Sequence, residues 1–416
     1  MNLENIKNSK TFCVYPFIHL ATLTDGSIPP CCIGSGTSAN LNNMSIKEAW
    51  NSDELKSIRL ALLKDQPVKN CYQCYNDEAA GVSSHRQRSN NDYMNTSKDE
   101  IELALSSVEP DGSISVDPFT LDIRAGNVCN LKCVMCRPNE SSKWLSDAKS
   151  IATITNSLEL KADWSHKASI NTKDFSWVDQ EAFWEEFKLL VPNLKEIIFG
   201  GGEPFVSKSI NNLISYMVET GHSKHIKIRF HTNGTQIPVN FWPMIDKFKE
   251  IQLMFSIDGY KEQNYYTRYP ANWGEILNNL ILADNSKAKS KILCSIHSLN
   301  ILDIDKLYSW FLDYPFKQIN RSSIVFGRVY NPNYLNPQGL PLHIKNQITN
   351  RINTFIEKYS SQRPNHFDSL KSNLNWIMDT HESNLDTLKE YVNNLDQVRG
   401  TSFVNTFPEL SKLLDE

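Results

Sequence analysis

The densest group of reactive side chains in the sequence is a run of three cysteines with C-x3-C-x2-C spacing. Cys129, Cys133 and Cys136 lie within G-N-V-C-N-L-K-C-V-M-C-R-P, residues 126–138. Three converging thiolates suit a [4Fe–4S] cluster, because a cubane can bind three cysteines and leave one iron open to another ligand. The spacing alone leaves two alternatives, a zinc site completed by a distant histidine and three incidental thiols.

A glycine-rich turn, G-G-E-P, offers a second place for a ligand. Its residues are Gly201, Gly202, Glu203 and Pro204. Glycines let a ligand approach the backbone closely, and the carboxylate of Glu203 is an acceptor for an ammonium group. Such a turn is weak evidence for a ligand site by itself. Its combination with the three-cysteine motif is strong evidence.

A further group of cysteines lies near the N-terminus. Cys13, Cys31, Cys71 and Cys74 supply four thiols, enough to saturate a cubane without an outside ligand. From this segment alone a zinc site is the better interpretation, because C-x2-C with two distant cysteines is common in zinc proteins. Cys32 adjoins Cys31, and neighbouring side chains of an extended segment point in opposite directions, so we expect Cys32 not to be a ligand.

The elements that must position these motifs are predicted from short β-rich runs that alternate with amphipathic stretches. The six expected strands are 119–124, 194–200, 226–233, 251–258, 291–299 and 323–330. The expected helices between them include 205–220, 240–250, 272–285 and 303–313. Six β/α repeats predict an α/β fold with a parallel sheet, wound open or as a partial barrel. Such folds carry their chemistry at the carboxyl ends of the strands, where both motifs fall.

The rest of the chain is organised around this region. We predict four segments: a cysteine-rich module over 1–95, a polar connector over 96–118, the α/β domain over 119–335 and a helical extension over 336–416. Within the module, Ser45 and Glu48 have capping-box spacing ahead of a helix expected to reach about residue 64. Residues 155–178 are polar and are predicted to be an insertion.

Composition narrows the class of protein. Acidic residues outnumber basic ones, 47 against 43, so we expect no nucleic-acid partner. No apolar run approaches the roughly 20 residues that span a bilayer, and the N-terminus lacks the apolar core of a signal peptide. We therefore expect a cytoplasmic protein with no membrane partner. Thiols stay reduced in that compartment, so clustered cysteines favour metal ligation over disulfides.

The combination of C-x3-C-x2-C with G-G-E-P resembles the radical SAM superfamily, over about residues 115–335. The resemblance implies a partial (β/α)6 TIM-type barrel in which the three cysteines hold a [4Fe–4S] cluster. S-adenosylmethionine would fill the open iron through its amino and carboxylate groups, with G-G-E-P bonded to the amino group. The implied reaction is reductive cleavage to methionine and a 5′-deoxyadenosyl radical, which abstracts a substrate hydrogen. The implied electron donor is a reductase, flavodoxin or ferredoxin.

Other positions fit the same family pattern. Ser256 and Asp258 are two apart on a strand, hence on one face, and would bond the ribose hydroxyls. Arg268 in Y-Y-T-R-Y-P matches an arginine that pairs with the methionyl carboxylate, although a solvated surface arginine is an alternative. Asn233 in H-T-N-G matches a polar residue near the nucleoside. His297 is most simply a core histidine, and no motif marks a general base.

The N-terminal cysteines also resemble a known module. The spacing C-x12-G-x4-C over Cys13, Gly26 and Cys31 is similar to the SPASM and twitch modules that accompany many radical SAM enzymes. A twitch module holds one auxiliary [4Fe–4S] cluster and a SPASM module two, so four available cysteines favour the twitch label. This module precedes the barrel, whereas it commonly follows it. A cluster with four cysteine ligands would transfer an electron or hold the module together.

Three functions are open from the sequence. The first is a radical SAM enzyme that modifies a peptide or protein, by analogy with the auxiliary-cluster subgroup. The second is a radical SAM dehydrogenase or related enzyme acting on a small molecule such as an aminocyclitol or sugar. The third is a non-enzymatic iron–sulfur or zinc scaffold, which would need neither an open iron nor an amino-acid clamp. No motif indicates the substrate, the position of hydrogen abstraction or the oligomeric state.

Overall fold

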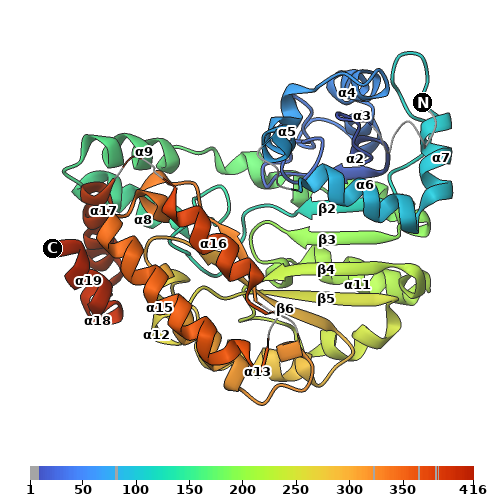
Figure 1. The fold of residues 1–416 in the computed structure, drawn as a ribbon. Coiled ribbons are helices and arrows are strands. Elements are labelled where there is room, and N and C mark those ends of the chain that lie inside the picture. Colours follow the sequence, from blue (N-terminus) through green and yellow to red (C-terminus); the bar gives the residue numbers. More distant parts are fainter. Residues whose placement is uncertain (1–8, 80–82, 322–323, 364–365, 380–381, 383) are drawn as a thin grey trace. The chain divides into compact units, whose positions relative to one another are not determined.

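Strands follow one another across the sheet in the order of the sequence (Figure 1). The computed structural model describes residues 9–79, 83–321, 324–363, 366–379, 382 and 384–416. Seven strands lie within these residues: β1 (His19–Ala21), β2 (Thr120–Arg124), β3 (Glu196–Gly200), β4 (Lys227–Thr232), β5 (Glu250–Ser256), β6 (Lys289–Ile296) and β7 (Val325–Arg328). All six predicted strands are confirmed as β2 to β7, and β1 is an additional strand.

The chain divides into two compact units. Unit 1 comprises the chain up to Asn127, Asn171–Arg229 and Lys247–Lys249, and unit 2 comprises Val128–Ile170, Phe230–Asp246 and Glu250–Glu416. Strands β1 to β3 belong to unit 1 and β5 to β7 to unit 2, while β4 contributes residues to both.

In unit 1, β1, β2 and β3 run parallel. His19 pairs with Thr120, and Thr120 pairs with Glu196. The segment H-L-A of β1 was missed as a strand because three residues are too short to show an alternating pattern, and all three are buried. The helices and 3-10 turns of this unit are α2 (Tyr15–Ile18), α3 (Ile46–Trp50), α4 (Asp53–Leu63), η1 (Lys69–Cys71), α5 (Tyr72–Ala79), α6 (His85–Thr96), α7 (Lys98–Ser106), η2 (Thr172–Asp179), α10 (Glu181–Leu190), η3 (Val191–Asn193), η4 (Pro204–Val206), α11 (Lys208–Glu219) and η5 (His222–His225).

The helix predicted after the capping box is interrupted. The box itself is confirmed, with Ser45 bonded to the Glu48 N–H and Glu48 bonded back to Ser45. The chain then leaves the helix at Asn51, whose side chain bonds both the N–H and the carbonyl of Ile114, at 2.9 and 3.1 Å. This two-point contact explains the break between α3 and α4, which the local sequence pattern did not reveal. Helix α7 occupies part of the predicted connector and buries Ile101.

In unit 2, β5, β6 and β7 also run parallel, and their side chains alternate. Ile251, Leu253 and Phe255 are buried, while Gln252 and Met254 between them are half-buried. One face of β5 is therefore buried; α13 (Trp273–Asp284) contacts β6, and α14 (Ile304–Asp313) buries an apolar side of its own. The other helices and turns are α8 (Trp144–Ile154), α9 (Leu158–Ala168), η6 (Val239–Lys247), α12 (Glu262–Thr267), η7 (Ile301–Asp303), η8 (Ile319–Arg321), η9 (Asn333–Leu335), η10 (Pro337–Gly339), α15 (Leu342–Ser360), α16 (Asp368–Met378), α17 (Leu385–Arg399), α18 (Phe403–Thr406) and α19 (Pro408–Asp415).

One local expectation is wrong, and the structure adds detail to another. The segment expected as a helix over 240–250 forms the 3-10 turn η6, because Pro243 inside it lacks the N–H that an α-helix needs. The polar insertion expected over 155–178 contains α9, which buries Trp164. Parallel strands in chain order, helices between them, a cysteine-rich N-terminal region and C-terminal helices confirm the α/β partial-barrel class.

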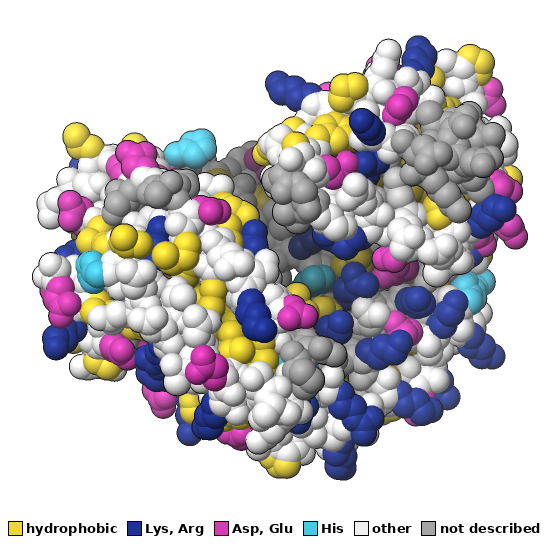
Figure 2. All heavy atoms as spheres, viewed as in Figure 1, with side chains coloured by type: hydrophobic (Ala, Val, Ile, Leu, Met, Phe, Trp, Pro, Cys, Tyr) yellow, Lys and Arg dark blue, Asp and Glu magenta, His cyan; other side chains and the backbone are white. Residues whose placement is uncertain are grey.

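The surface is polar and mixed in charge. Basic and acidic side chains are interspersed over the face shown in Figure 2. Within the described part of the chain, no helix combines the length and the apolarity needed to cross a bilayer.

Candidate functional site

The three-cysteine motif forms a loop in unit 2 whose backbone is held by a neighbouring turn. The N–H groups of Lys132 and Val134 donate to the carbonyls of Tyr269 and Thr267, at 2.6 and 2.8 Å. These two bonds lie on either side of Arg268 in the chain, so they set the position of Arg268 relative to the loop.

Side chains from α8, from α17 and from the segment just before α8 also support the loop. Three of them donate to its carbonyl oxygens: Ser141 Oγ to Leu131 at 2.6 Å, Trp144 Nε1 to Cys133 at 3.0 Å and Tyr391 Oη to Val134 at 2.7 Å. Trp144 belongs to α8 and Tyr391 to α17, and both are fully buried. The shape of the loop is therefore set in part by contacts from residues distant in the sequence.

A buried ion-pair network joins the same two helices to the loop. Asp147 of α8 accepts from Lys132 Nζ at 2.7 Å and from Arg399 Nε at 2.9 Å. The Arg399 guanidinium lies 4.4 Å from the ring centre of Trp144, a cation–π distance. No motif predicted Tyr391, Arg399 or Asp147 as part of this site.

The thiols of the loop lie beside a buried charged pair. Arg268 Nη1 donates to the Cys133 sulfur at 3.8 Å, and Arg268 Nε lies 2.7 Å from Asp258 Oδ2, an ion pair without the alignment of a hydrogen bond. The hydrogen bond from Cys136 lowers the pKa of Cys133 most, and the Arg268 charge lowers it further. The same bond raises the pKa of Cys136. Burial raises the pKa of Asp258, with Arg268 opposing this.

The other residues of unit 2 that the sequence singled out lie close to this loop or on β5. Asn233 Nδ2 donates at 2.8 Å to Asn130 Oδ1, so Asn233 contacts the cysteine motif directly. Its own oxygen accepts from the N–H and hydroxyl of Thr235. Ser256 is half-buried at the end of β5, whereas Asp258 is fully buried and accepts the Ser295 N–H at 2.7 Å.

The G-G-E-P turn of unit 1 lies against the end of β2. The N–H of Gly202 donates to the Gly126 carbonyl at 3.0 Å. Gly201 has φ +98°, and a Cβ there would lie 2.9 Å from the Arg124 carbonyl carbon and from the Gly126 oxygen. Only glycine fits this close approach. Glu203 is 3% exposed and accepts the Phe205 N–H at 3.3 Å.

Arg124, the last residue of β2, is a site residue that sequence reasoning missed. Its guanidinium binds both oxygens of the buried Asp122, at 3.0 and 3.2 Å. It lies over Gly200, where an added Cβ would be 3.0 Å from Arg124 Nη1. Gly200, which directly precedes the G-G-E-P turn, therefore makes room for this arginine.

The four N-terminal cysteines come together in unit 1. Cys13, Cys31, Cys71 and Cys74 line one small hollow, together with Tyr15, His85 and Arg86. Burial raises the pKa of Cys31 to about 12 and of Cys71 to about 11, and the neighbouring thiolates add to the rise. Such thiols favour a bound cation that stabilises their charged form. Among the described residues no three histidine, cysteine or acidic side chains lie close enough for a single metal ion.

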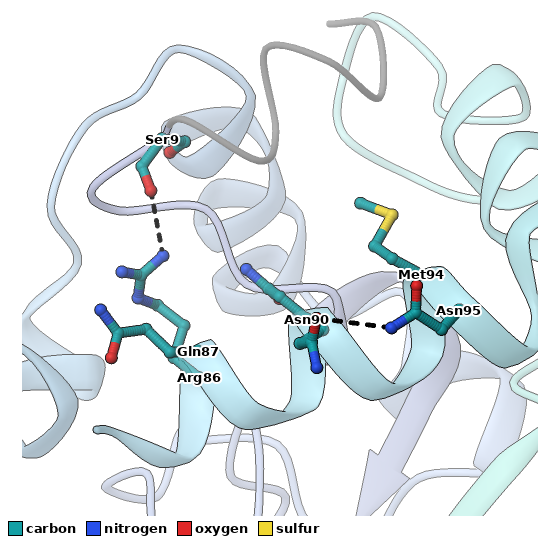
Figure 3. A pocket seen from close by; sticks show the side chains of 7 residues that line it. Ser9, Arg86, Gln87, Asn90, Met94 and Asn95 are labelled. Atoms are coloured by element: carbon teal, nitrogen blue, oxygen red, sulfur yellow. Dashed lines mark hydrogen bonds between the residues drawn. The ribbon is translucent and has the colours of Figure 1, made fainter.

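Helix α6 holds the segment that carries Cys13. Arg86 donates to the carbonyls of Ser9 and Phe12, and Asn90 bonds the Phe12 carbonyl and the Val14 N–H, at 2.8 and 2.9 Å. Figure 3 shows Arg86 reaching Ser9 from α6, beside a hollow that is also lined by carboxamides. These bonds hold Phe12 and Val14, the residues on either side of Cys13, and so they position Cys13.

Cys32 occupies a different position from its neighbour Cys31. Its side chain is exposed, and its sulfur lies 3.4 Å from His85 Nε2. All nine cysteines lie within the described residues, and none of them forms a disulfide there.

Comparisons with known proteins identify both regions. The model of the Radical SAM superfamily matches residues 123–311, and the model of SPASM, an iron–sulfur cluster-binding domain, matches residues 13–75. The first match spans the three-cysteine loop and the G-G-E-P turn, and the second spans the four N-terminal cysteines. No curated protein sequence matches the chain.

Several solved structures resemble the chain at low identity. One is described as native anSMEcpe with bound AdoMet, at 16% identity and TM-score 0.35, covering 58% of this chain and 61% of that one. Another is Streptococcus suis SuiB bound to S-adenosylmethionine, at 16% identity and TM-score 0.36, covering 78% and 66%. SuiB bound to precursor peptide SuiA matches at 14% identity and TM-score 0.36, covering 80% and 71%. TM-scores of this size do not define a shared architecture.

The donor sets fit the cofactors that the two domains imply: a radical SAM [4Fe–4S] cluster, S-adenosylmethionine and auxiliary iron–sulfur ligation. One site presents three thiols beside a buried guanidinium, and the other presents four. Soft thiolates are the usual protein ligands of such clusters. The chain carries a region that matches the Radical SAM superfamily, and this region is preceded by one that matches the SPASM domain.

Proposed function

We propose that the chain reductively cleaves S-adenosylmethionine to methionine and a 5′-deoxyadenosyl radical, which abstracts a hydrogen from a peptide or protein substrate. The observation that carries this proposal is the three-thiol loop, held rigidly in unit 2 with Arg268 at Cys133. Three thiolates leave one position of a cubane open to another ligand.

Cys129, Cys133 and Cys136 would hold the cluster, which would supply the electron for reductive cleavage of S-adenosylmethionine. The chain's own contribution is to hold these thiols in place through Tyr391, Trp144 and the 267–269 turn. A rigid loop keeps the ligand geometry constant while the substrate binds and leaves.

The proposed contacts to S-adenosylmethionine follow the residue types. Glu203, with Gly201, Gly202 and Pro204, would accept the ammonium group. Asn233, Ser256 and Asp258 would orient the nucleoside, with Asp258 acting through Arg268, to which it is bound. Arg268 has one terminal nitrogen, Nη2, beyond those that contact Asp258 and Cys133, and this nitrogen would meet the methionyl carboxylate.

Cys13, Cys31, Cys71 and Cys74 would hold an auxiliary [4Fe–4S] cluster. Four thiolates leave no iron open, so this cluster would transfer an electron or stabilise its module rather than bind the substrate. The module is proposed to span residues 1–95, followed by the connector 96–118, the barrel 119–335 and the helical extension 336–416. A flavodoxin, ferredoxin or reductase would supply the electron, in the cytoplasm.

Cleavage of S-adenosylmethionine in the absence of oxygen tests the proposal. The reconstituted chain is mixed with dithionite and S-adenosylmethionine, and 5′-deoxyadenosine is measured by chromatography. We expect formation by the wild type and by Cys32→Ala, a matched control that removes an exposed thiol outside the proposed ligands. We expect none from Cys133→Ala. Absence of product from the wild type with both clusters loaded would contradict the proposal.

A further inference from the structure

We propose that Arg268 acts on the three-cysteine cluster itself: its guanidinium, held in place by Asp258, raises the reduction potential of the cluster through Cys133. The inference rests on the proposed function, because it requires a cluster on Cys129, Cys133 and Cys136. It makes Arg268 a positioning and tuning residue whose effect is present before S-adenosylmethionine binds.

The guanidinium directs one nitrogen to each of two groups. Nη1 donates to the Cys133 sulfur at 3.8 Å, within the range of an N–H···S contact, and Nε lies 2.7 Å from Asp258 Oδ2. The side chain of Arg268 is 10% exposed and that of Asp258 is fully buried. A guanidinium keeps its positive charge in proteins, and the neighbouring carboxylate of Asp258 compensates for its burial.

Asp258 is itself fixed, so it holds Arg268 in one direction. Its Oδ1 accepts the Ser295 N–H at 2.7 Å, and its own N–H donates to Asn264 Oδ1 at 2.9 Å. The backbone of Arg268 is fixed as well, since Thr267 and Tyr269 on either side bind the loop N–H groups of Val134 and Lys132. Arg268 is thus tied to the loop through its neighbours and to Asp258 through its side chain.

This geometry has an electrostatic consequence. Reduction adds one electron to a cluster whose three thiolates are already negative. A fixed positive charge at a ligand sulfur stabilises the reduced state more than the oxidised state, because the interaction grows with the negative charge. Exclusion of water strengthens this effect, since the pair lies in a region of low dielectric constant. The potential is therefore higher than it would be with a neutral side chain at position 268.

The test is a potentiometric titration followed by electron paramagnetic resonance, with both clusters loaded and S-adenosylmethionine absent. Dithionite supplies the electron. The Cys129→Ala, Cys133→Ala, Cys136→Ala triple variant identifies the signal of the auxiliary cluster, which then serves as an internal reference in every sample. We expect Arg268→Gln to move the potential of the three-cysteine cluster to more negative values, and Arg268→Lys to move it less. The auxiliary potential stays unchanged.

Two further variants separate tuning from general damage. The double variant Arg268→Gln, Asp258→Asn leaves no unpaired buried charge, so it can be measured even if Arg268→Gln alone fails to fold. The potential of its three-cysteine cluster is also expected to lie below the wild-type value. Arg351→Gln removes an arginine of unit 2 that pairs with Asp303, Asp305 and Glu409, and it leaves the potential unchanged. An unchanged three-cysteine potential in both Arg268 variants and in the double variant overturns the inference. If the wild type forms no 5′-deoxyadenosine, the result instead overturns the proposed function.

Discussion

Single residues determine whether the turn at G-G-E-P can form. Gly201 combines a positive φ with a close backbone approach, whereas Gly221 has φ +78° and nothing within 4 Å of an added Cβ. The two positions therefore separate the cost of the dihedral angle from the cost of the clash.

We predict that Gly201→Ala lowers the free energy of unfolding more than Gly221→Ala does. The strained φ alone costs roughly 1–2 kcal/mol, and at position 201 a steric overlap adds to it. Urea unfolding monitored by circular dichroism measures both variants. Equal losses for the two would show that the backbone around Gly201 relaxes freely.

His297 gives a pH prediction at the same scale. Burial, together with the smaller effect of the Arg268 charge, lowers its pKa to about 3. The unfolded chain binds the proton near pH 6.5 and the folded chain does not, so stability falls as the pH drops below 6.5. Between pH 7 and pH 5 this histidine accounts for a loss of about 2 kcal/mol.

Comparison with His297→Gln isolates this effect. The variant is expected to lose about 2 kcal/mol less than the wild type over the same interval, by urea unfolding at pH 5, 6 and 7. His19, whose pKa burial also lowers to about 3, contributes equally to both proteins. Parallel pH dependences for the two would mean that His297 is protonated in the folded state.

At the scale of elements, α17 is a support of the three-cysteine loop. Tyr391 bonds the Val134 carbonyl from a position 257 residues away in the chain. Its ring also stacks on Trp164 of α9, whose ring stacks on Trp144 of α8. The C-terminal helices thus contribute to the site through contacts that no local motif reveals.

We predict that Tyr391→Phe destabilises the fold by about 1–3 kcal/mol, because the buried Val134 carbonyl loses its donor. The reconstituted variant should also retain less iron after desalting, since the loop is less constrained. Tyr330→Phe is the matched control, because Tyr330 is 50% exposed. If both variants retain wild-type iron and stability, α17 does not support the loop.

An element could be predicted from the sequence when the contacts that define it lie close together in the chain. The alternation of Ile251, Leu253 and Phe255 marked β5 within seven residues, and the cysteine and glycine spacings marked their loops locally. Strand β1 has only three residues, all buried, so it shows no alternation of buried and exposed side chains. Asn51 ended α3 because of Ile114, and Tyr391 joined the site because of Val134. Those contacts connect segments far apart in the chain, where a local pattern holds no information.

At the scale of the whole molecule, the chain carries two thiol sites of different completeness. The site in unit 2 has three cysteines with a guanidinium at one of them, and the site in unit 1 has four that share one hollow. We expect the first to accept an outside ligand and the second to be saturated by the protein. This difference in completeness is our central claim about the chain.

We predict that the two sites load independently. Cys71→Ala combined with Cys74→Ala should remove only the auxiliary cluster and leave the other four irons in place. Iron and sulfide content per chain, measured after reconstitution, should fall by half. Loss of all iron would show that the module is required for the three-cysteine site to form.

The most direct test of the central claim is the response of each cluster to S-adenosylmethionine in the electron paramagnetic resonance spectrum. The Cys71→Ala, Cys74→Ala variant reports the three-cysteine cluster alone, and the Cys129→Ala, Cys133→Ala, Cys136→Ala variant reports the auxiliary cluster alone. We predict that S-adenosylmethionine changes the reduced signal of the first and leaves that of the second unchanged. A response from the four-cysteine cluster, or none from the three-cysteine cluster, would contradict the account.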